Sequence, residues 1–507
     1  MRRFTTVLIA LLVIVLHAQG QPEPPQQISD VIFLQINDVY EIAPLRGGRE
    51  GGLARVATMK ARLKKECPNT FLVVAGDFLS PSAIGTSRRE GRRIAGAQMV
   101  DVMNRAGVDL VTFGNHEFDI TEAELLDRVN ESRFSWVSSN VKHRTSAGPA
   151  PFVQKMGDTA AVFPEYRILT IPAASGGTFR IGILAVTLDK NGADFIQYEN
   201  PYAAARRVCD RLKAESDCIV ALTHLSMHQD RELAKRVPEL KLIMGGHEHR
   251  NMVFRAGETM ITKADANART AWVHRLRFAR AGGVELVSEL QTIDDALPED
   301  SITASAVHTW LSIAYKGFEE LGLQPWAPVT TLHEALDGRE SSIRYGPTNL
   351  GKAVCRAMLA AAGQADAAIV NSGSVRIDDE LSGPVSQYDI IRTLPFGGKI
   401  LVAEMTGHLL GRVLDAGILN VGRGGYLQTE NIRGSGNVGE WMIGNTALSQ
   451  GKTYRVVLTD FLISGREGGL GFLTPDNPGV SGVREPDGLV PNDIRMALVR
   501  YLQQGGR

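Results

Sequence analysis

Short, continuous apolar runs alternate with amphipathic stretches through the first half of this 507-residue chain. The apolar runs cover residues 31–36, 71–75, 110–113, 181–186, 219–222 and 240–244. Between the first two runs, Leu53, Val56 and Leu63 have the spacing of one face of a helix. Strands that are apolar along their whole length must be covered on both faces, and connecting helices supply that cover. The sequence therefore predicts an α/β fold of the mixed α+β kind.

A second segment begins where Pro325 and Pro328 interrupt the chain. It follows a looser region and then a helical stretch over residues 301–321. The looser region covers residues 281–300. Beyond the prolines, the patterns predict helices over 349–362 and 492–503 and strands over 367–370, 400–405 and 454–460. We therefore predict two domains, residues 28–300 and 326–507, joined by a linker helix within 301–325.

The first twenty residues have the pattern of a secretory signal peptide. Arg2 and Arg3 precede an apolar run over residues 7–16, and Ala18-Gln19-Gly20 supplies the small residues of a cleavage site. The run is too short to span a bilayer, and no later segment reaches about 18 continuous apolar residues. We expect residues 1–20 to be removed, the protein to be periplasmic or secreted, and no stable membrane anchor to be present.

Composition excludes several classes of protein. Lys and Arg total 55 against 56 for Asp and Glu, which is unlike the basic surface of a nucleic-acid binder. With 44% hydrophobic residues the chain has material for buried cores, and four cysteines are too few for a disulfide-built scaffold. Cys209 and Cys218 fall on a predicted helix and the strand after it. They have two interpretations, a local disulfide or two small buried thiols.

Five polar motifs each follow an apolar run directly. They are Asn37-Asp38, Gly76-Asp77, the segment 114–119 (GNHEFD), Thr223-His224 and the segment 245–249 (GGHEH). The carboxyl ends of strands are where α/β sheets place their ligands, and glycine allows a close backbone approach there. Carboxylate, amide and imidazole groups together suit divalent transition ions. One such motif alone is usually a turn, but the ordered set predicts a metal site.

These motifs resemble those of the calcineurin-like metallophosphoesterases, and more closely those of the 5'-nucleotidase and UDP-sugar hydrolase family. The resemblance implies a four-layer αββα sandwich that carries two divalent metal ions, zinc, manganese or similar. It implies that six residues hold the metals: Asp38, Asp77, Asn115, His224, His247 and His249. In that scheme Asp77 bridges the two ions, and Asp38 with His249 completes the first position. The other three ligands form the second position.

The same resemblance assigns a catalytic pair, His116 and Asp119. The imidazole would lie near the reacting phosphoryl group, and the carboxylate would orient it. Two ions about 3.5–4 Å apart can activate a water molecule at neutral pH, because coordination lowers the pKa of water from 15.7 to about 7. A protonated His116 would stabilise charge on the phosphoryl oxygens or help the leaving oxygen depart.

One position departs from the family's first motif, Asp-x-His, in which both residues bind metal. Here Tyr40 stands where the imidazole belongs. Three interpretations are open. Tyr40 binds the metal as a phenolate, which would favour an ion such as ferric iron, or Tyr40 is a spectator and water fills the gap in a weakened first position. In the third interpretation the site is degraded, and the protein binds its ligand without catalysing a reaction. We favour the spectator, since every other implied ligand and the catalytic pair are present.

The second segment resembles the family's substrate domain. The segment 371–376 (NSGSVR) is similar to an Asn-Gly-Gly-Gly-Ile-Arg motif, and Arg344 precedes a Thr-Asn-Leu-Gly signature at 348–351. Arginine suits phosphate recognition because its planar group donates two parallel hydrogen bonds. The resemblance further implies that two phenylalanines sandwich a nucleobase and that an acid contacts the ribose. The implied substrate-binding residues are Arg344, Asn371, Arg376, Phe396, Phe461 and Glu467.

The sequence thus predicts an exported, metal-dependent phosphohydrolase acting on a small-molecule partner, nucleoside 5'-monophosphates. Nucleotide sugars and cyclic nucleotides are further expected substrates. Two alternatives stay open: a metallophosphoesterase for a non-nucleotide or sulfur ester, and a non-catalytic nucleotide- or metal-binding homologue, which Tyr40 motivates. Nucleic acid is not an expected partner. The patterns predict neither an oligomeric state nor a preferred base.

Overall fold

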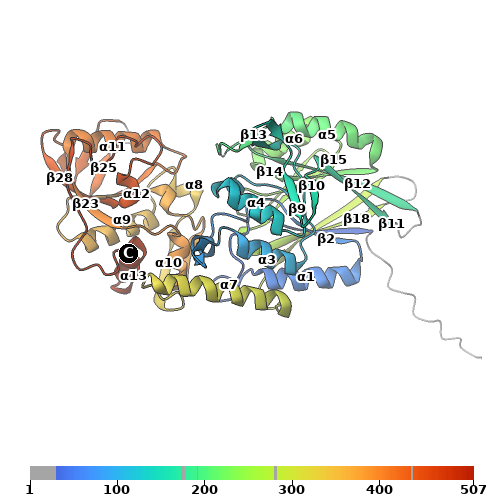
Figure 1. Ribbon diagram of the computed structural model, residues 1–507, viewed down its shortest axis with the longest axis horizontal. Helices are drawn as coiled ribbons and strands as arrows, with labels where there is room; N and C mark the ends of the chain where they lie inside the picture. Colours follow the sequence, from blue (N-terminus) through green and yellow to red (C-terminus); the bar gives the residue numbers. More distant parts are fainter. Residues whose placement is uncertain (1–29, 173–176, 191, 279–282, 435–437, 507) are drawn as a thin grey trace, which may run out of the picture.

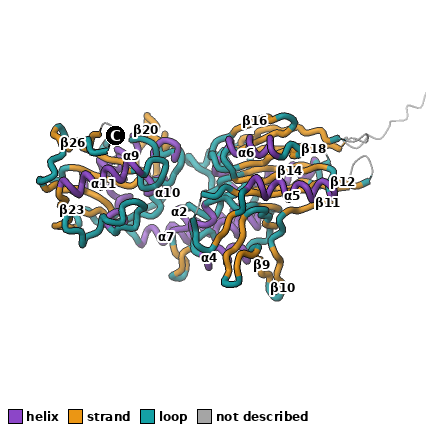
Figure 2. The backbone as a smooth tube through the Cα atoms, turned by 90° about the horizontal axis from the view of Figure 1, so that it is seen from above, coloured by secondary structure: helices purple, strands orange, loops and turns teal. Residues whose placement is uncertain are grey.

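The computed structural model describes residues 30–172, 177–190, 192–278, 283–434 and 438–506. The predicted signal peptide lies outside these residues. Among the described residues, no helix combines the length and the apolar character needed to cross a membrane. The chain forms two parts that lie side by side in both views, with loops meeting between them (Figures 1 and 2).

Two six-stranded sheets form the N-terminal part. In the first sheet the order is β19 (Val284–Thr292), β18 (Thr270–Phe278), β1 (Val31–Ile36), β2 (Thr70–Val74), β5 (Leu110–Val111) and β6 (Ser135–Trp136). In the second it is β11 (Tyr166–Pro172), β12 (Thr178–Thr187), β14 (Cys218–His224), β15 (Leu240–Gly245), β17 (Thr259–Lys263) and β16 (Met252–Ala256). The strands β1, β2, β5 and β6 run parallel, as do β12, β14, β15 and β17.

The two faces of each sheet pack against different partners. Val31 and Phe33 of β1 belong to an apolar core shared with strands of the second sheet. Ile32 and Leu34 point the other way, into a core formed with the helices α1 (Leu53–Glu66), α3 (Ala97–Ala106) and α7 (Ser301–Glu320). The helices α5 (Pro201–Glu215) and α6 (Met227–Arg236) cover the outer face of the second sheet. The predicted four-layer αββα sandwich is confirmed.

Smaller elements decorate this sandwich. They are the helices α2 (Ala83–Thr86) and α4 (Glu122–Glu131), the 3-10 helices η1 (His116–Asp119) and η2 (Ala266–Ala268), and the strands β3 (Arg88–Arg89), β4 (Arg92–Arg93), β7 (Val141–Thr145), β8 (Gly148–Ala150), β9 (Val153–Met156), β10 (Thr159–Val162) and β13 (Ile196–Tyr198).

The C-terminal part is built on a five-stranded sheet. Its order is β24 (Leu427–Glu430), β21 (Ala367–Asn371), β28 (Thr453–Thr459), β23 (Ile400–Thr406) and β29 (Val480–Arg484). The helices α9 (Asn349–Ala362) and α13 (Ile494–Gln503) share a core with one face, and α11 (Gly407–Leu419) and α12 (Asp460–Ile463) with the other. The remaining elements are α8 (Glu340–Ile343), α10 (Gln387–Thr393), η3 (Ser372–Ser374), β20 (Pro328–Asp337), β22 (Glu380–Ser386), β25 (Ile432–Gly434), β26 (Trp441–Ile443) and β27 (Thr446–Ala447).

The predicted linker helix is α7, and it begins where Asp300 caps the backbone N–H of Thr303 at 2.9 Å. Its buried side chains Trp310, Ala314 and Phe318 join the N-terminal core. Figure 1 shows it running beneath α3 toward α10. The helix therefore packs on the sandwich along its length and leads from there into the second part.

One sequence prediction is wrong in this region. Residues 281–300 were expected to be loose, but Val284–Thr292 is the strand β19, which pairs antiparallel with β18 at the edge of the first sheet. An edge strand has a neighbour on one side only, and here half-buried and exposed positions alternate along most of its length. Its polar residues therefore hide the continuous apolar pattern that marks the central strands.

Candidate metal centre

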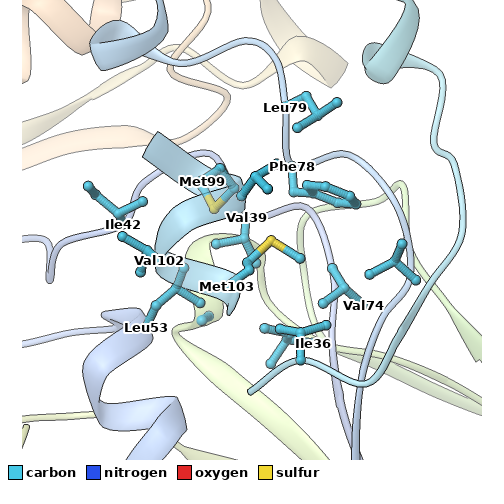
Figure 3. Packing of buried hydrophobic residues seen from close by; sticks show 14 of the residues in the cluster. Ile36, Val39, Ile42, Leu53, Val74, Phe78, Leu79, Met99, Val102 and Met103 are labelled. Carbon is cyan, nitrogen blue, oxygen red and sulfur yellow. The ribbon is translucent and has the colours of Figure 1, made fainter. Parts of the chain in front are cut away.

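The loops after β1 and β2 carry the two central carboxylates. Asp38 and Asp77 adopt left-handed backbone conformations, with φ of 53° and 56°. Their neighbours Val39 and Phe78 are fully buried in the N-terminal core, where they pack near α3 (Figure 3). Each loop is thus anchored in the core by an apolar residue while the adjacent aspartate is left for the site.

Asp38, Asp77 and His224 converge on one point. One ligand atom from each lies within 4.8 Å of the others, and all three residues are buried. Nε2 of His224 is 3.0 Å from Oδ2 of Asp77 and 3.9 Å from Oδ1 of Asp38. Nδ1 of His224 donates to the carbonyl oxygen of Ala75 at 2.7 Å, so Nε2 is the nitrogen that faces the carboxylates. This tautomer is the one that a metal ligand requires.

The loop after β15 adds two more imidazoles. The backbone N–H of His247 donates to Oδ2 of Asp38 at 2.8 Å, and its ring packs edge-on against His224 with centroids 5.4 Å apart. Nε2 of His249 is 3.2 Å from Oδ1 of Asp38. Both histidines have positive φ values, 92° and 57°. The predicted pair from this motif therefore lies at the cluster.

Asn115 comes to the same place from the first sheet, directly before η1. It is 3% exposed. The next residue, His116, donates its backbone N–H to Oδ1 of Asp77 at 2.7 Å. A Cβ atom on Gly114 would lie 2.1 Å from that same oxygen, so this close approach requires glycine. The structure thus brings Asp38, Asp77, His224, His247 and His249 together, and Asn115 lies between two residues that approach Asp77 closely.

The electrostatics of the cluster follow from burial and charge. Burial opposes charge on each group, yet His224 and His116 hold the pKa of Asp77 below its usual range. Against the same burial penalty, Asp77 and Asp38 raise the pKa of His224 to about 9. Burial, with His224 and Lys190 beside it, holds the pKa of His247 well below the usual value. Two buried carboxylates among three imidazoles are a donor set that fits divalent cations, which would take the place of the protons on these rings.

Tyr40 points into the cluster. Its hydroxyl is 3.0 Å from Nε2 of His249, 3.3 Å from Oδ2 of Asp77 and 3.4 Å from Oδ1 of Asp38. The side chain therefore lies against both carboxylates and His249, and it is not turned away from the site.

His116 and Asp119 form a pair at the mouth of the cluster. Nδ1 of His116 is 2.6 Å from Oδ2 of Asp119. Burial disfavours charge on the imidazole, but Asp77 and Asp119 outweigh it and raise the pKa of His116. Burial likewise opposes charge on Asp119, and His116 and Arg376 overcome it to lower the pKa of that carboxyl. Each partner thus favours the charged form of the other.

The C-terminal part reaches this pair directly. Nη2 of Arg376 is 3.0 Å from Oδ2 of Asp119 and 3.5 Å from Nδ1 of His116. The guanidinium also lies over the ring of Phe396, 6.0 Å from its centroid. Arg344, 8% exposed, pairs with Glu340 at 3.0 Å and lines a cavity together with Tyr40, His116 and His249.

Two other predicted substrate residues, Asn371 and Glu467, contact each other. Nδ2 of Asn371 donates to Oε2 of Glu467 at 2.7 Å. Phe396 and Phe461 flank neighbouring strand ends, because Ile400 of β23 pairs with Thr459 of β28. Phe396 is 60% exposed.

Phe461 has its own cation partner, since the guanidinium of Arg466 lies 5.3 Å from its ring centroid. Each of the two phenylalanine rings is thus beneath an arginine. No ring contact joins the two phenylalanines to each other among the described aromatic pairs.

Two charged residues that sequence reasoning missed hold the site loops. Glu117 is fully buried and accepts the backbone N–H groups of Asp77, Phe78, Leu79 and Gly114. Burial, reinforced by Asp77, raises its pKa to about 7.

Lys263 is the second of them and is also fully buried. It donates to the carbonyl of Gly246 at 2.6 Å and lies 2.9 Å from Oδ2 of Asp230 and 2.5 Å from Oε2 of Glu248. Glu117 and Glu248 belong to the polar motifs 114–119 and 245–249, so the sequence could have pointed to them. A lone lysine in a strand gives no sequence sign of such a role.

The cysteines have a simple outcome. All four, Cys67, Cys209, Cys218 and Cys355, are buried, and none of them forms a disulfide. Of the two interpretations for Cys209 and Cys218, the structure has the buried thiols. Burial raises the pKa of Cys209 to about 11 and that of Cys218 to about 12, which is typical of unreactive core residues.

Comparison with known families agrees with this arrangement. A family model for calcineurin-like phosphoesterases matches residues 31–251, and one for the C-terminal domain of 5'-nucleotidases matches residues 328–474. The chain belongs to the 5'-nucleotidase family of calcineurin-like phosphoesterases. The predicted family is confirmed, and so is the prediction of a 5'-nucleotidase-type phosphoesterase hydrolase at the level of that family.

Individual relatives of this family are distant. The 5'-nucleotidase of Bos taurus is 24% identical over 477 residues, which cover 82% of this chain and 78% of that protein. The trifunctional nucleotide phosphoesterase YfkN of Bacillus subtilis is 25% identical over 498 residues, 89% of this chain. This chain spans only 33% of the length of YfkN.

Among solved structures, a 5'-nucleotidase precursor from Thermus thermophilus has a TM-score of 0.69 at 21% identity. The match covers 94% of this chain and 96% of that one. At this identity the likeness establishes a shared fold over nearly the whole length.

Proposed function

We propose that this protein is an exported, metal-dependent phosphohydrolase that releases phosphate from nucleoside 5'-monophosphates, with nucleotide sugars and cyclic nucleotides as further substrates. The observation that carries the proposal is the convergence of Asp38, Asp77 and His224 within 4.8 Å, faced by Arg376 from the other part of the chain. The names of the relatives, 5'-nucleotidase and nucleotide phosphoesterase, support the substrate class.

The ligand roles follow the family pattern. Asp77 is proposed to bridge two cations, with Asp38 and His249 at the first position and the remaining ligands, Asn115, His224 and His247, at the second. Divalent ions there would supply the Lewis-acid chemistry by which two-metal sites activate water and neutralise phosphoryl oxygens. The protein's own contribution is to hold these donors buried and correctly oriented.

The reaction adds water across a phosphate ester. A bond forms between phosphorus and the oxygen of water, the bond to the nucleoside 5'-oxygen breaks, and that oxygen receives a proton. In our proposal His116 stabilises the phosphoryl group or supplies the proton. Its Nδ1 is bound by Asp119, which leaves Nε2 for the substrate, and the neighbouring carboxylates favour its charged form.

The C-terminal part is proposed to hold the nucleotide. Arg344 and Arg376 would bind phosphate, and Phe396 with Phe461 would stack on the base. Glu467, fixed by Asn371 at 2.7 Å, would accept from the ribose hydroxyls.

Substrate entry requires the two parts to separate. The cavity lined by Tyr40, His116, His249, Arg344 and Arg376 has a volume of about 10 Å³, roughly the space of one water molecule. A nucleotide is far larger, so contacts such as Arg376 to Asp119 must open and reform during turnover. We propose the region of α7 as the hinge.

The decisive experiment compares phosphate release from AMP by the metal-reconstituted wild-type protein and by Asp77→Asn. Asp210→Asn is the matched control, because Asp210 is an exposed acid on α5. We expect turnover by the wild type and Asp210→Asn and background rates for Asp77→Asn. Equal background rates in all three would leave only a binding role. Turnover of an aryl phosphate or a sulfur ester without turnover of AMP would keep the chemistry and change the substrate.

A further inference from the structure

A carboxylate from the C-terminal part reaches a proposed metal ligand of the N-terminal part. Oδ2 of Asp378 accepts a hydrogen bond from Nδ1 of His249. Asp378 follows Arg376 by two residues, whereas His249 lies in the loop between β15 and β16. The contact therefore joins the two parts of the chain through the cluster itself.

The other ring nitrogen of His249 faces the centre. Nε2 lies 3.2 Å from Oδ1 of Asp38 and 3.0 Å from the hydroxyl of Tyr40. With Nδ1–H bound to a carboxylate, Nε2 is the nitrogen left to bind a cation, and the plane of the ring is fixed. A metal-bound histidine that donates its second nitrogen to a carboxylate is oriented and made more basic by it.

Asp378 is itself held in place. It adopts a left-handed conformation with φ of 41°, which residues other than glycine rarely do. Its Oδ1 accepts from the backbone N–H of Glu340 at the start of α8. A strained backbone persists when its surroundings fix it, so the position of this carboxylate is set by the C-terminal part.

We infer that Asp378 is a positioning residue that orients His249 for cation binding, so that the first metal position is completed only when the two parts are closed. The inference rests on the proposed metal-dependent function. Tyr40 replaces the imidazole expected in the first motif, so His249 is the imidazole assigned to the first metal position. The orientation of His249 therefore matters particularly in this chain. By linkage, a cation at the first position favours closure as much as closure favours the cation.

Asp379 offers a matched control. Its Oδ2 is 3.1 Å from Nη1 of Arg269, and its Oδ1 is 3.9 Å from Nη2 of Arg46. Both arginines belong to the N-terminal part, so Asp379 also joins the two parts, but it pairs with them and not with His249. Replacing it removes a contact between the parts without removing the support of the ligand.

The test is calorimetric titration of the metal-free, full-length protein with Mn²⁺. We expect two binding events in the wild type, and in Asp378→Ala one of them weakened about 10- to 100-fold, the usual effect of losing such a partner. Asp379→Ala loosens closure but keeps the support of His249, so it should weaken Mn²⁺ binding much less than Asp378→Ala does. Asp378→Asn keeps an acceptor for Nδ1 and should fall between wild type and alanine. If the alanine variant does not fold, the affinity of Asp378→Asn for Mn²⁺ tests the inference in its place.

Two further measurements distinguish a loss of His249 positioning from a general loss of structure. In Co²⁺-loaded protein, the visible absorption should change in Asp378→Ala and not in Asp379→Ala, because only the former alters a ligand. In X-ray scattering, Mn²⁺ should make the wild type more compact than it makes Asp378→Ala.

The outcomes are distinct. If Asp378→Ala binds Mn²⁺ as the wild type does, or if both alanine variants lose affinity equally, the inference is wrong while AMP hydrolysis by the wild type still supports the proposed function. Equal compaction of the wild type and Asp378→Ala refutes the coupling to closure. A wild type that binds no Mn²⁺ and hydrolyses no AMP overturns both.

Discussion

The hydroxyl of Tyr40 lies 3.0 Å from Nε2 of His249, the imidazole assigned to the first metal position. The hydroxyl also lies near both carboxylates, and the spectator interpretation stays a prediction that metal titration can test. Burial, then the charges of Asp77 and Asp38, raise the pKa of Tyr40 well above its usual value. Without a strong Lewis acid, the phenol therefore keeps its proton and donates to its neighbours.

Changing Tyr40→His should strengthen metal binding. Removing a residue that merely supports a ligand costs about 10- to 100-fold in affinity, so adding a ligand should lower the metal concentration for half-maximal activity by at least about tenfold. Activity measured against Mn²⁺ concentration checks this, with Tyr40→Phe as the control that adds no ligand. A visible absorption band that is present in the wild type and bleached by Tyr40→His would instead identify an iron–phenolate.

Replacing both Phe396 and Phe461 by alanine should weaken nucleotide binding selectively. Stacking of a base on an aromatic side chain is worth about 1–3 kcal/mol, so KM for AMP should rise roughly 10- to 100-fold. KM for a simple aryl phosphate should not change. Phe254, beneath Arg231 on the N-terminal part, is the matched control. Unchanged KM for AMP in the double variant would show that the substrate is not held by its base.

The sequence predicts the centre of this fold better than its margins. The central strand Val31–Ile36 and the helix Asn349–Ala362 have the predicted bounds, because each carries an uninterrupted pattern. Edge strands such as β19 escape prediction, since their burial depends on a neighbour elsewhere in the chain. The strand β5 is shorter than the apolar run 110–113, because only Leu110 and Val111 pair with the neighbouring strands.

The candidate site shows the same division. Residues that follow strand ends could be grouped from the sequence, because sheet topology brings such ends together. Asp378 could not, since its contact with His249 depends on how two domains dock. Lys263 could not either, because a single lysine in a strand gives no sign that two acids and two carbonyls surround it.

Removing the Lys263 ammonium should destabilise the N-terminal sandwich. Lys263→Met leaves Asp230 and Glu248 without their buried partner, and breaking a buried pair costs about 3–5 kcal/mol. Urea unfolding measures this loss. Lys213→Met is the control, because Lys213 pairs with Glu239 on the surface, where such pairs contribute about 0–1 kcal/mol. Equal unfolding midpoints for the two variants would mean that the Lys263 network contributes no more than a surface pair.

The most specific pH prediction concerns His274, which is buried between the two sheets. Its Nε2–H donates to Oε1 of Gln35 at 2.9 Å, and its Nδ1 accepts from the hydroxyl of Ser288 at 2.8 Å. Gln35 in turn donates to the carbonyl of Gly245, at the end of the strand that leads to the metal cluster. The neutral imidazole therefore satisfies this network, whereas a second ring proton would leave Ser288 without its acceptor.

Burial lowers the pKa of His274 to about 3, while the unfolded chain has a value near 6.5. Between these values the unfolded state binds more protons, so His274 favours unfolding increasingly as the pH falls below 6.5. At pH 5 this titration lowers the free energy of unfolding by about 2 kcal/mol.

In His274→Gln, the free energy of unfolding should fall less steeply than in the wild type between pH 6.5 and 4. The two slopes should differ by about 1.4 kcal/mol per pH unit. Urea unfolding at several pH values measures the slope, and His228→Gln, at an exposed position, should keep the wild-type slope. If His274→Gln also keeps it, a different buried group sets the acid sensitivity of this fold.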